Sequence, residues 1–309
     1  MSKVNTVLGT VDSTMLGYTR MHEHLFFGWP GSEMDPFVEF DEENAIKAVT
    51  EMVLGMKKRG ISTLVDATPM NLARRVEFMS RIAENSGINI IASTGFSDMP
   101  FLPFHFAQMD VDKLAAVMER EITNGIRGTT TKAGIIKIGT SRGTVTESET
   151  RIFKAAARVS RDTGVPIITH TTDSTMGIEQ IDILEGEGAD LSRVVIGHTC
   201  GSSDISYHLN IIERGAYAGF DRIGWTEFQR DEVRLVAIAG LIGAGYTDKI
   251  VLSQDIIAFM PSTSGLPLPE TKPTYLDDEF IPRLQKGGIT PANIEQILVH
   301  NPQHIFEGR

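Results

Sequence analysis

Eight short segments rich in valine and isoleucine recur along the chain, and longer amphipathic segments separate them. Apolar runs with little polar alternation are typical of parallel strands that helices cover on both faces. The segments lie at residues 17–24, 62–68, 89–95, 134–139, 165–170, 193–198, 216–221 and 249–255. Eight strands with intervening helices in about 250 residues predict a (β/α)8 barrel, the TIM-barrel fold of the α/β class.

The segments between the strands carry helix start and stop signals. Residues 41–60 begin with acidic side chains and end with basic ones and a glycine, an order that suits the helix dipole. Glycine also ends the helical patterns at residues 73–87, 111–125 and 148–164. No linker or change in composition divides the chain, so residues 1–309 are expected to form one domain.

Two late segments lack a repeating pattern. Residues 256–275 follow the eighth predicted strand as a long proline-rich loop, which is a candidate lid or pocket wall. Residues 290–308 are expected to form two short helices broken at Pro302. A doubly wound sheet is the alternative architecture, but it would usually carry a glycine-rich phosphate loop after its first strand, and MHEHLFFG at 21–28 is not one.

The charge balance and the cysteine content argue against several classes of protein. A formal net charge of -11 and a pI near 5.2 argue against nucleic acid as a partner, because phosphate binding relies on clustered lysine and arginine. No run of about 18 apolar residues could span a membrane, and the N-terminal segment lacks the apolar region of a signal peptide. Cys200 is the one cysteine, so an internal disulfide is impossible and a reducing cytoplasm is the expected location.

Polar residues of metal-binding type lie at the ends of the predicted strands: His22, His24, Lys137, His170, His198 and Asp255. In a barrel of this kind the active site lies at the C-terminal ends of the strands. Because residues i and i+2 of a strand share a face, His22 and His24 should both face the barrel interior, with Glu23 facing the helices. Two imidazoles on one face suit a metal ion, although a hydrogen-bonded pair of core histidines is the other explanation.

Lys137 is the one charged residue in an apolar predicted strand, and its position predicts an inward side chain. A lysine at a strand tip can also snorkel, or pair with Asp255. Beside metal cations an ammonium would be repelled, so a metal site requires Lys137 to be neutral or chemically modified. Taken singly, His170 and His198 could be core histidines and Asp255 a helix cap. Their convergence with the others at one mouth of one barrel favours a metal site.

These motifs, in this order, resemble the phosphotriesterase family of the amidohydrolase superfamily over nearly the whole chain. LGYTRMHEHLF is similar to that family's first strand, GIIKIGT to its lysine strand and PIITHT to its fifth strand. RVVIGHTCGSSD, YAGFDRIG and VLSQD are similar to the sixth, seventh and eighth strands. The resemblance implies two divalent metal ions and the same barrel fold.

The resemblance also implies a role for each ligand. The two histidines of the first strand and Asp255 would bind the more buried metal, and His170 and His198 the more exposed one. An N6-carboxylated Lys137 would bridge both ions, and this modification removes the charge conflict noted above. Zinc is the expected metal, and manganese, cobalt or iron would also accept nitrogen and oxygen ligands.

Other branches of the superfamily fit the chain less well. Deaminases of the superfamily use one metal and lack the lysine of the fourth strand. Cyclic-amide hydrolases usually carry an added β-sandwich, for which the 21 residues before His22 leave no room. Within the phosphotriesterase family, lactonases outnumber phosphotriesterases, so a lactone is the expected substrate.

Candidate substrate-binding residues follow the strand ends. Arg222 in GFDRIG matches lactonase-like members and is expected to orient a polar group of the substrate. Asp221, beside it, is expected to hold local structure or to form an ion pair with Arg222. Trp29, Phe96 and Phe259 are expected to lie in a mostly apolar wall that binds an aliphatic or aromatic tail.

The chain departs from the lactonases at two places. Related lactonases often have a tyrosine after the third strand, where this chain has Phe96, Ser97 and Asp98. Many members have Gly-Asp after the histidine of the sixth strand, where this chain has TCG, and we expect Cys200 in that sequence to pack in the core. Both departures concern the substrate more than the metal chemistry.

The sequence thus predicts a dinuclear-metal hydrolase that opens lactones, with Asp255 and Arg222 as catalytic residues. A hydroxide shared by the metals would attack the carbonyl, and Asp255 would pass a proton to the leaving alkoxide. A phosphotriesterase or carboxylesterase with the same groups is the alternative enzyme, and a catalytically silent binding protein is the non-enzymatic alternative. The expected partners are a small-molecule lactone or ester and a second copy of the chain in a homodimer.

Overall fold

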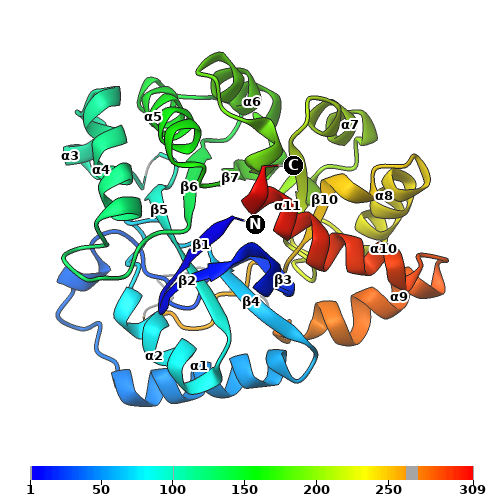
Figure 1. The fold of residues 1–309 in the computed structure, drawn as a ribbon, viewed down its shortest axis with the longest axis horizontal. Helices are drawn as coiled ribbons and strands as arrows, with labels where there is room; N and C mark the ends of the chain where they lie inside the picture. The colour runs from blue at the N-terminus through cyan, green and yellow to red at the C-terminus, as the bar shows by residue number, and fades with distance from the viewer. Residues whose placement is uncertain (1, 100, 262–270, 309) are drawn as a thin grey trace.

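Eight parallel strands form one sheet whose spatial order follows the chain order. The computed structural model describes residues 2–99, 101–261 and 271–308. The strands are β3 (Tyr18–Glu23), β4 (Ile61–Asp66), β5 (Asn89–Phe96), β6 (Ile135–Thr140), β7 (Ile167–Thr171), β8 (Val194–Ile196), β9 (Tyr217–Phe220) and β10 (Ile250–Leu252). All eight predicted strands are present, and the sheet curls into a nearly closed barrel (Figure 1).

Backbone hydrogen bonds bring the first and last strands of the sheet together beyond the end of β10. The N–H of Asp255 donates to the carbonyl of His22 over 3.1 Å, and the N–H of His24 donates to the carbonyl of Ile256 over 2.7 Å. The N–H of Ala258 then donates to the carbonyl of His24 over 2.8 Å. These bonds confirm the predicted TIM-barrel-like fold, and they fix the segments that carry three candidate ligands against each other.

Helices α1 to α8 lie between successive strands and cover the outside of the barrel, and α9 to α11 follow the last strand (Figure 1). They are α1 (Glu42–Lys57), α2 (Val76–Ser86), α3 (Phe104–Ala107), α4 (Val111–Thr123), α5 (Glu147–Thr163), α6 (Gly177–Gly186), α7 (Ile205–Glu213), α8 (Asp231–Gly243), α9 (Ile281–Lys286), α10 (Pro291–Glu295) and α11 (Asn301–Glu307). Asp41 caps α1 through its side chain, and Gly87 and Gly164 end α2 and α5 in the left-handed conformation, as their sequence signals predict.

One apolar side chain from each of the eight strands fills the lower part of the barrel interior. These residues are Met21, Val65, Ile91, Ile135, Ile168, Val195, Tyr217 and Val251. Val4 joins this layer from the hairpin of β1 (Lys3–Thr6) and β2 (Gly9–Asp12), and Ile305 and Phe306 join it from α11. The hairpin and α11 cross the middle of the barrel in Figure 1. They close its N-terminal end, so a cavity can open only at the other end.

The C-terminal segment differs from the prediction. The two short helices expected to break at Pro302 are one continuous helical segment, in which a π-helical turn at Gln296–His300 joins α10 to α11. Pro302 lies in the first turn of α11. A proline there lacks an N–H that the wider π turn does not need, so the helix continues through it.

The loop expected at 256–275 is only partly described. Residues 256–261 continue from β10 and pair with the first strand segment, whereas 262–270 lie outside the described residues. The part of the chain that the structure describes has no helix long and apolar enough to cross a membrane.

Candidate metal centre and active-site cavity

All six predicted ligands lie together at the C-terminal ends of the strands. They are His22 of β3, His24 beyond it, Lys137 of β6, His170 of β7, and His198 and Asp255 after β8 and β10. A bulge between Arg20 and Glu23 in the pairing of β3 with β4 lets both Met21 and His22 face the interior. Glu23 points away from the site and accepts the backbone N–H groups of Gln254 and Ile256.

Asp255 lies at the centre of the cluster. Its Oδ1 is 3.1 Å from Nε2 of His24 and 3.5 Å from Nε2 of His22. Its Oδ2 is 3.8 Å from Nε2 of His198. One ligand atom from each of His22, His198 and Asp255 lies within 4.8 Å of the other two. Three ring nitrogens and a carboxylate that converge in this way fit a divalent cation.

Asp221, just after β9, holds two of these histidines from behind. Its Oδ2 lies 2.8 Å from Nδ1 of His22 and its Oδ1 lies 2.9 Å from Nδ1 of His198. Nδ1 of His24 is likewise 2.8 Å from the Thr68 hydroxyl. With Nδ1 engaged, each ring presents Nε2 to the cluster, which fixes the tautomer that can bind a metal. Asp221 therefore orients two of the predicted ligands, and among the described contacts it has no ion pair with Arg222, the alternative expected for it.

The pKa shifts keep the histidine lone pairs available. Burial, with nearby Lys137, lowers the pKa of His22 to about 3. Burial also lowers the pKa of His170 and of His198. Burial alone would raise the pKa of Asp255, but His198, His22 and Arg222 hold it well below its usual range. At neutral pH His22, His170 and His198 are thus neutral and Asp255 is ionised, the protonation states that bind metals.

Lys137 is 4 % exposed and sits against the histidines. Its Nζ lies 2.9 Å from Nε2 of His22 and donates to the carbonyl oxygen of Thr169 over 3.1 Å. Burial lowers the pKa of Lys137 to about 8. An ammonium here would use the same His22 lone pair that a metal needs. The donor set therefore fits a metal only if Lys137 is neutral or carries an added group.

His170 can be assigned the opposite tautomer to the other ligands. The hydroxyl of Thr172 lies 2.9 Å from the carbonyl oxygen of Thr140, to which it donates its one proton. Nε2 of His170 lies 3.2 Å from the same hydroxyl and must therefore carry the proton it donates there. This leaves the Nδ1 lone pair of His170 free to bind a metal.

Two candidate ligands have a strained backbone. His198 has φ 58° and Asp255 has φ 54°, which is the left-handed region that side chains other than glycine rarely adopt. β8 ends at Ile196 and β10 at Leu252, so both strands end before these residues and earlier than predicted. Strain at a ligand is tolerated where it fixes the geometry of a site.

A cavity of about 310 Å³ opens over the cluster and is lined by all six ligands. Trp29 lines it, stacks on Phe101 with ring centres 4.8 Å apart and meets Phe27 edge-on. Arg222 also lines it, and its Nε donates to Oδ2 of Asp255 over 2.9 Å. Asp255 thus pairs with Arg222 and not with Lys137, the pairing that the sequence left open as an alternative to a metal site.

Two expected substrate contacts lie elsewhere. Phe96 is 0 % exposed and packs against Phe106 on the helix side of β5, with ring centres 4.6 Å apart. Phe259 packs among Phe26, Phe40 and Phe78 outside the cavity lining. The apolar wall of the cavity includes Phe27, Leu72, Phe101, Trp225, Phe228 and Ile257. Cys200 is buried in the core, as expected.

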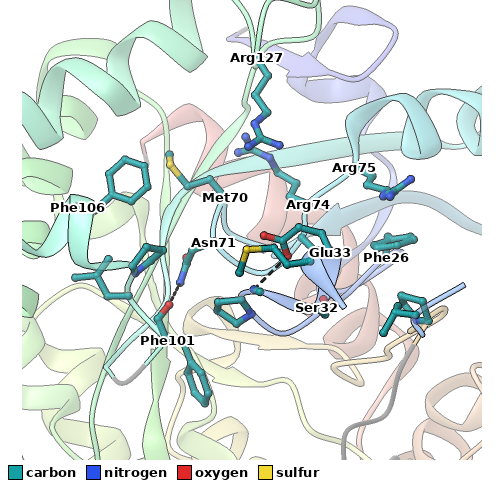
Figure 2. A pocket seen from close by; sticks show the side chains of 18 of the residues that line it. Phe26, Ser32, Glu33, Met70, Asn71, Arg74, Arg75, Phe101, Phe106 and Arg127 are labelled. Atoms are coloured by element: carbon teal, nitrogen blue, oxygen red, sulfur yellow. Dashed lines mark hydrogen bonds between the residues drawn. The ribbon is translucent and has the colours of Figure 1, made fainter. Parts of the chain in front are cut away.

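A second cavity of about 650 Å³ lies beside the first and shares Phe101 with it (Figure 2). Figure 2 shows Arg74, Arg75 and Arg127 on one side of it. Arg74 donates two hydrogen bonds to Glu121, and Arg75 pairs with Glu42. None of the six predicted ligands lines this cavity, so the chemistry belongs to the smaller one.

Comparisons with known proteins agree with this site. Residues 2–306 match the model of the phosphotriesterase family. The chain is 35 % identical to the phosphotriesterase homology protein of Escherichia coli over 94 % of this chain and 98 % of that protein. It is 33 % identical to the aryldialkylphosphatase of Saccharolobus solfataricus over 96 % of this chain and 97 % of that protein.

The fold also matches solved structures of the same kind. A mutant of a PTE-like lactonase from Deinococcus radiodurans superposes with a TM-score of 0.92 at 36 % identity, over 98 % of this chain and 99 % of that one. A family match along nearly the whole chain and a buried His/Asp cluster at the expected strand ends lead to one conclusion. The chain is a metal-dependent hydrolase that belongs to the phosphotriesterase family.

Proposed function

We propose that this hydrolase opens lactones with two divalent metal ions held by the six clustered residues. The observation that carries the proposal is their convergence, from five strands, under a cavity of about 310 Å³ with an apolar wall. A cyclic ester of small size fits such a cavity, with its carbonyl toward the ligands and its tail along the wall. The similarity to a PTE-like lactonase supports this choice.

When bound, the two ions would lower the pKa of a shared water and polarise the carbonyl of the ester. His22, His24 and Asp255 are proposed to hold one ion, and His170 and His198 the other. Lys137 is proposed to carry a carboxylate, which would supply an anionic oxygen in place of the ammonium.

Asp255 is proposed to transfer the proton, and Arg222 is proposed to orient the substrate carbonyl. The Asp255 carboxylate is ionised and faces the cavity, so it can accept a proton from the attacking water and return it to the leaving alkoxide. Arg222 holds Oδ2 of Asp255 and reaches the same cavity. Its guanidinium also lies 4.2 Å over the ring of Phe228, which limits its movement.

The aromatic wall is proposed to bind the substrate tail and to exclude water. Trp29 is fixed between Phe27 and Phe101 by ring contacts, and Trp225 also lines the cavity. The indole N–H of Trp225 donates to the carbonyl of Gln254 over 2.7 Å, so its polar atom is satisfied away from the substrate. Removing the tail from water favours binding by roughly 25 cal/mol for each Å² of apolar surface that is buried.

A phosphotriester is the second candidate substrate, because a relative of similar identity is an aryldialkylphosphatase. The test compares kcat/KM of the metal-loaded protein on a panel of lactones, on an aryl ester and on paraoxon. We expect kcat/KM on at least one lactone to exceed that on paraoxon by tenfold or more, since a lactone presents a planar carbonyl to the clustered residues, whereas a triester is already tetrahedral and needs room for three substituents. A higher kcat/KM on paraoxon than on every lactone, or no hydrolysis of any lactone, would overturn the lactonase proposal. The assignment as a metal-dependent hydrolase would still stand.

Zinc is the proposed metal, with manganese, cobalt or iron as substitutes. A homodimer and a cytoplasmic location stay predictions from the sequence, and sedimentation of the purified protein is the direct test of the first.

A further inference from the structure

The loop after β5 places a carboxylate on the cavity wall, where related lactonases often have a tyrosine. Asp98 lines the cavity and is only 6 % exposed. It is not one of the six clustered ligands. Burial raises the pKa of its carboxyl group, which shows that its surroundings compensate the charge only in part.

The hydrogen bonds of Asp98 leave one of its carboxylate oxygens without a short hydrogen bond. Oδ1 accepts from the hydroxyl of Ser97 over 2.7 Å. Oδ2 is 3.5 Å from the hydroxyl of Thr172, but that hydroxyl donates its proton to the carbonyl of Thr140 over 2.9 Å. A hydroxyl has one proton to give, so Oδ2 keeps acceptor capacity toward the cavity.

The segment that carries Asp98 is held on both sides. Asn71 accepts the N–H of Ser97 over 2.9 Å and donates to the carbonyl of Phe101 over 2.9 Å, a bond drawn in Figure 2. The buried carboxylate of Glu149 accepts the N–H of Met99 over 3.0 Å. These contacts fix the carboxylate before any substrate arrives, and a fixed acceptor loses little entropy on binding.

Asp98 lies next to a metal ligand. A Cβ atom at Gly139 would lie 3.1 Å from Cβ of His170 and 3.5 Å from Cβ of Asp98, so both residues flank this glycine. A larger residue in β6 would push them apart. A group bound to Oδ2 of Asp98 would therefore lie close to a carbonyl that is held over His170.

We propose that Asp98 binds a hydroxyl group on the substrate, so that the preferred lactones carry a hydroxyl beside the ring carbonyl. This inference rests on the proposed lactonase function. An unsubstituted lactone has hydrogen-bond acceptors only. Its binding would remove water from Oδ2 of Asp98 without supplying another hydrogen-bond donor. A hydroxylated lactone donates to that oxygen. Sites built to accept from a substrate hydroxyl reject analogues that lack it.

The experiment uses two lactones that differ by one group, α-hydroxy-γ-butyrolactone and γ-butyrolactone. The metal-loaded wild type should show the higher kcat/KM on the hydroxylated lactone. Asp98→Ala should lower the ratio of the two kcat/KM values by about 10- to 100-fold, as expected for a hydrogen bond to a charged acceptor. Asp98→Asn keeps a weaker acceptor and should lower the ratio less.

Asp173→Ala is the matched control. This residue also lines the cavity, but its side chain is 39 % exposed and pairs with Arg142 at 2.6 Å. Its loss removes the same charge from the mouth and should leave the ratio within about threefold of the wild type, since exposed ion pairs contribute little. Thermal melting and metal content are measured on every variant to show that the site is intact.

The outcomes separate this inference from the proposed function. If the wild type opens both lactones equally, or if Asp98→Ala leaves the ratio unchanged, the subsite is overturned and the lactonase function stands. If neither lactone is opened, the lactonase function fails, and calorimetric binding of the two lactones then decides the subsite. If the wild type binds the hydroxylated lactone more tightly and Asp98→Ala abolishes this preference, the Asp98 subsite is supported. If the wild type binds both lactones equally, the subsite is overturned.

Discussion

Lys137→Ala should remove most of the bound metal and lower kcat/KM by about 100-fold or more. Lys137 is buried among the ligands, with its Nζ 2.9 Å from Nε2 of His22. A carboxylated side chain would be an anionic ligand at this point, and even residues one shell further from a metal typically contribute 10- to 100-fold. Elemental analysis and steady-state kinetics of the variant measure both effects.

The chemical form of Lys137 can be tested in the same variant. Short carboxylic acids added to Lys137→Ala should restore part of the activity and of the metal binding, because they supply the missing carboxylate. Lys132→Ala is the matched control, since this lysine precedes β6 and lies outside the cavity lining. Wild-type metal content in Lys137→Ala, or rescue by an alkyl amine and not by an acid, would contradict the carboxylated form.

Asp255→Asn should lower kcat on lactones by about 100-fold or more, within the range typical of general acid–base groups. The carboxylate accepts from Nε of Arg222 and faces three histidine Nε2 atoms, so it can hold metal and move a proton. An amide keeps the shape of the side chain and loses the basic oxygen. Kinetics at matched metal content isolate the proton step.

The leaving group separates the two roles of Asp255. An alkoxide needs a proton to leave, whereas 4-nitrophenolate does not, so Asp255→Asn should damage lactone opening more than hydrolysis of a 4-nitrophenyl ester. Asp248→Asn is the control, since this exposed residue precedes β10 at the opposite end of the strand. An equal loss of kcat on both substrates would contradict the proton-transfer role and would mean that Asp255 acts only as a metal ligand.

Regular alternation explains why the sequence could place most of the candidate ligands on the interior face of the barrel. Ile135 and Ile168 fill the barrel interior, so Lys137 and His170, two residues further on, must point inward above them. The same rule shows why the expectation for Phe96 failed. Ile91 is an interior residue, and a side chain five positions later in the same strand lies on the helix side.

Other features have no local sequence signal. The role of Asp221 depends on two histidines that are 199 and 23 residues away in the chain, so only the closed barrel brings them within hydrogen-bonding distance. The hairpin of β1 and β2 has four residues in each strand and a mostly polar outer pattern, which periodicity does not distinguish from a loop. Phe259 lies outside the cavity wall predicted for it because its ring packs in an apolar cluster with Phe26 and Phe40.

The metal content of the wild-type protein tests the central claim most directly. The protein is stripped with a chelator, reloaded with zinc, dialysed, and analysed for metal while activity on the best lactone is followed. We predict about two zinc ions per chain, with activity that is lost on stripping and returns as the second ion binds. A protein that holds no metal or a single ion, or that keeps full activity after stripping, would contradict it.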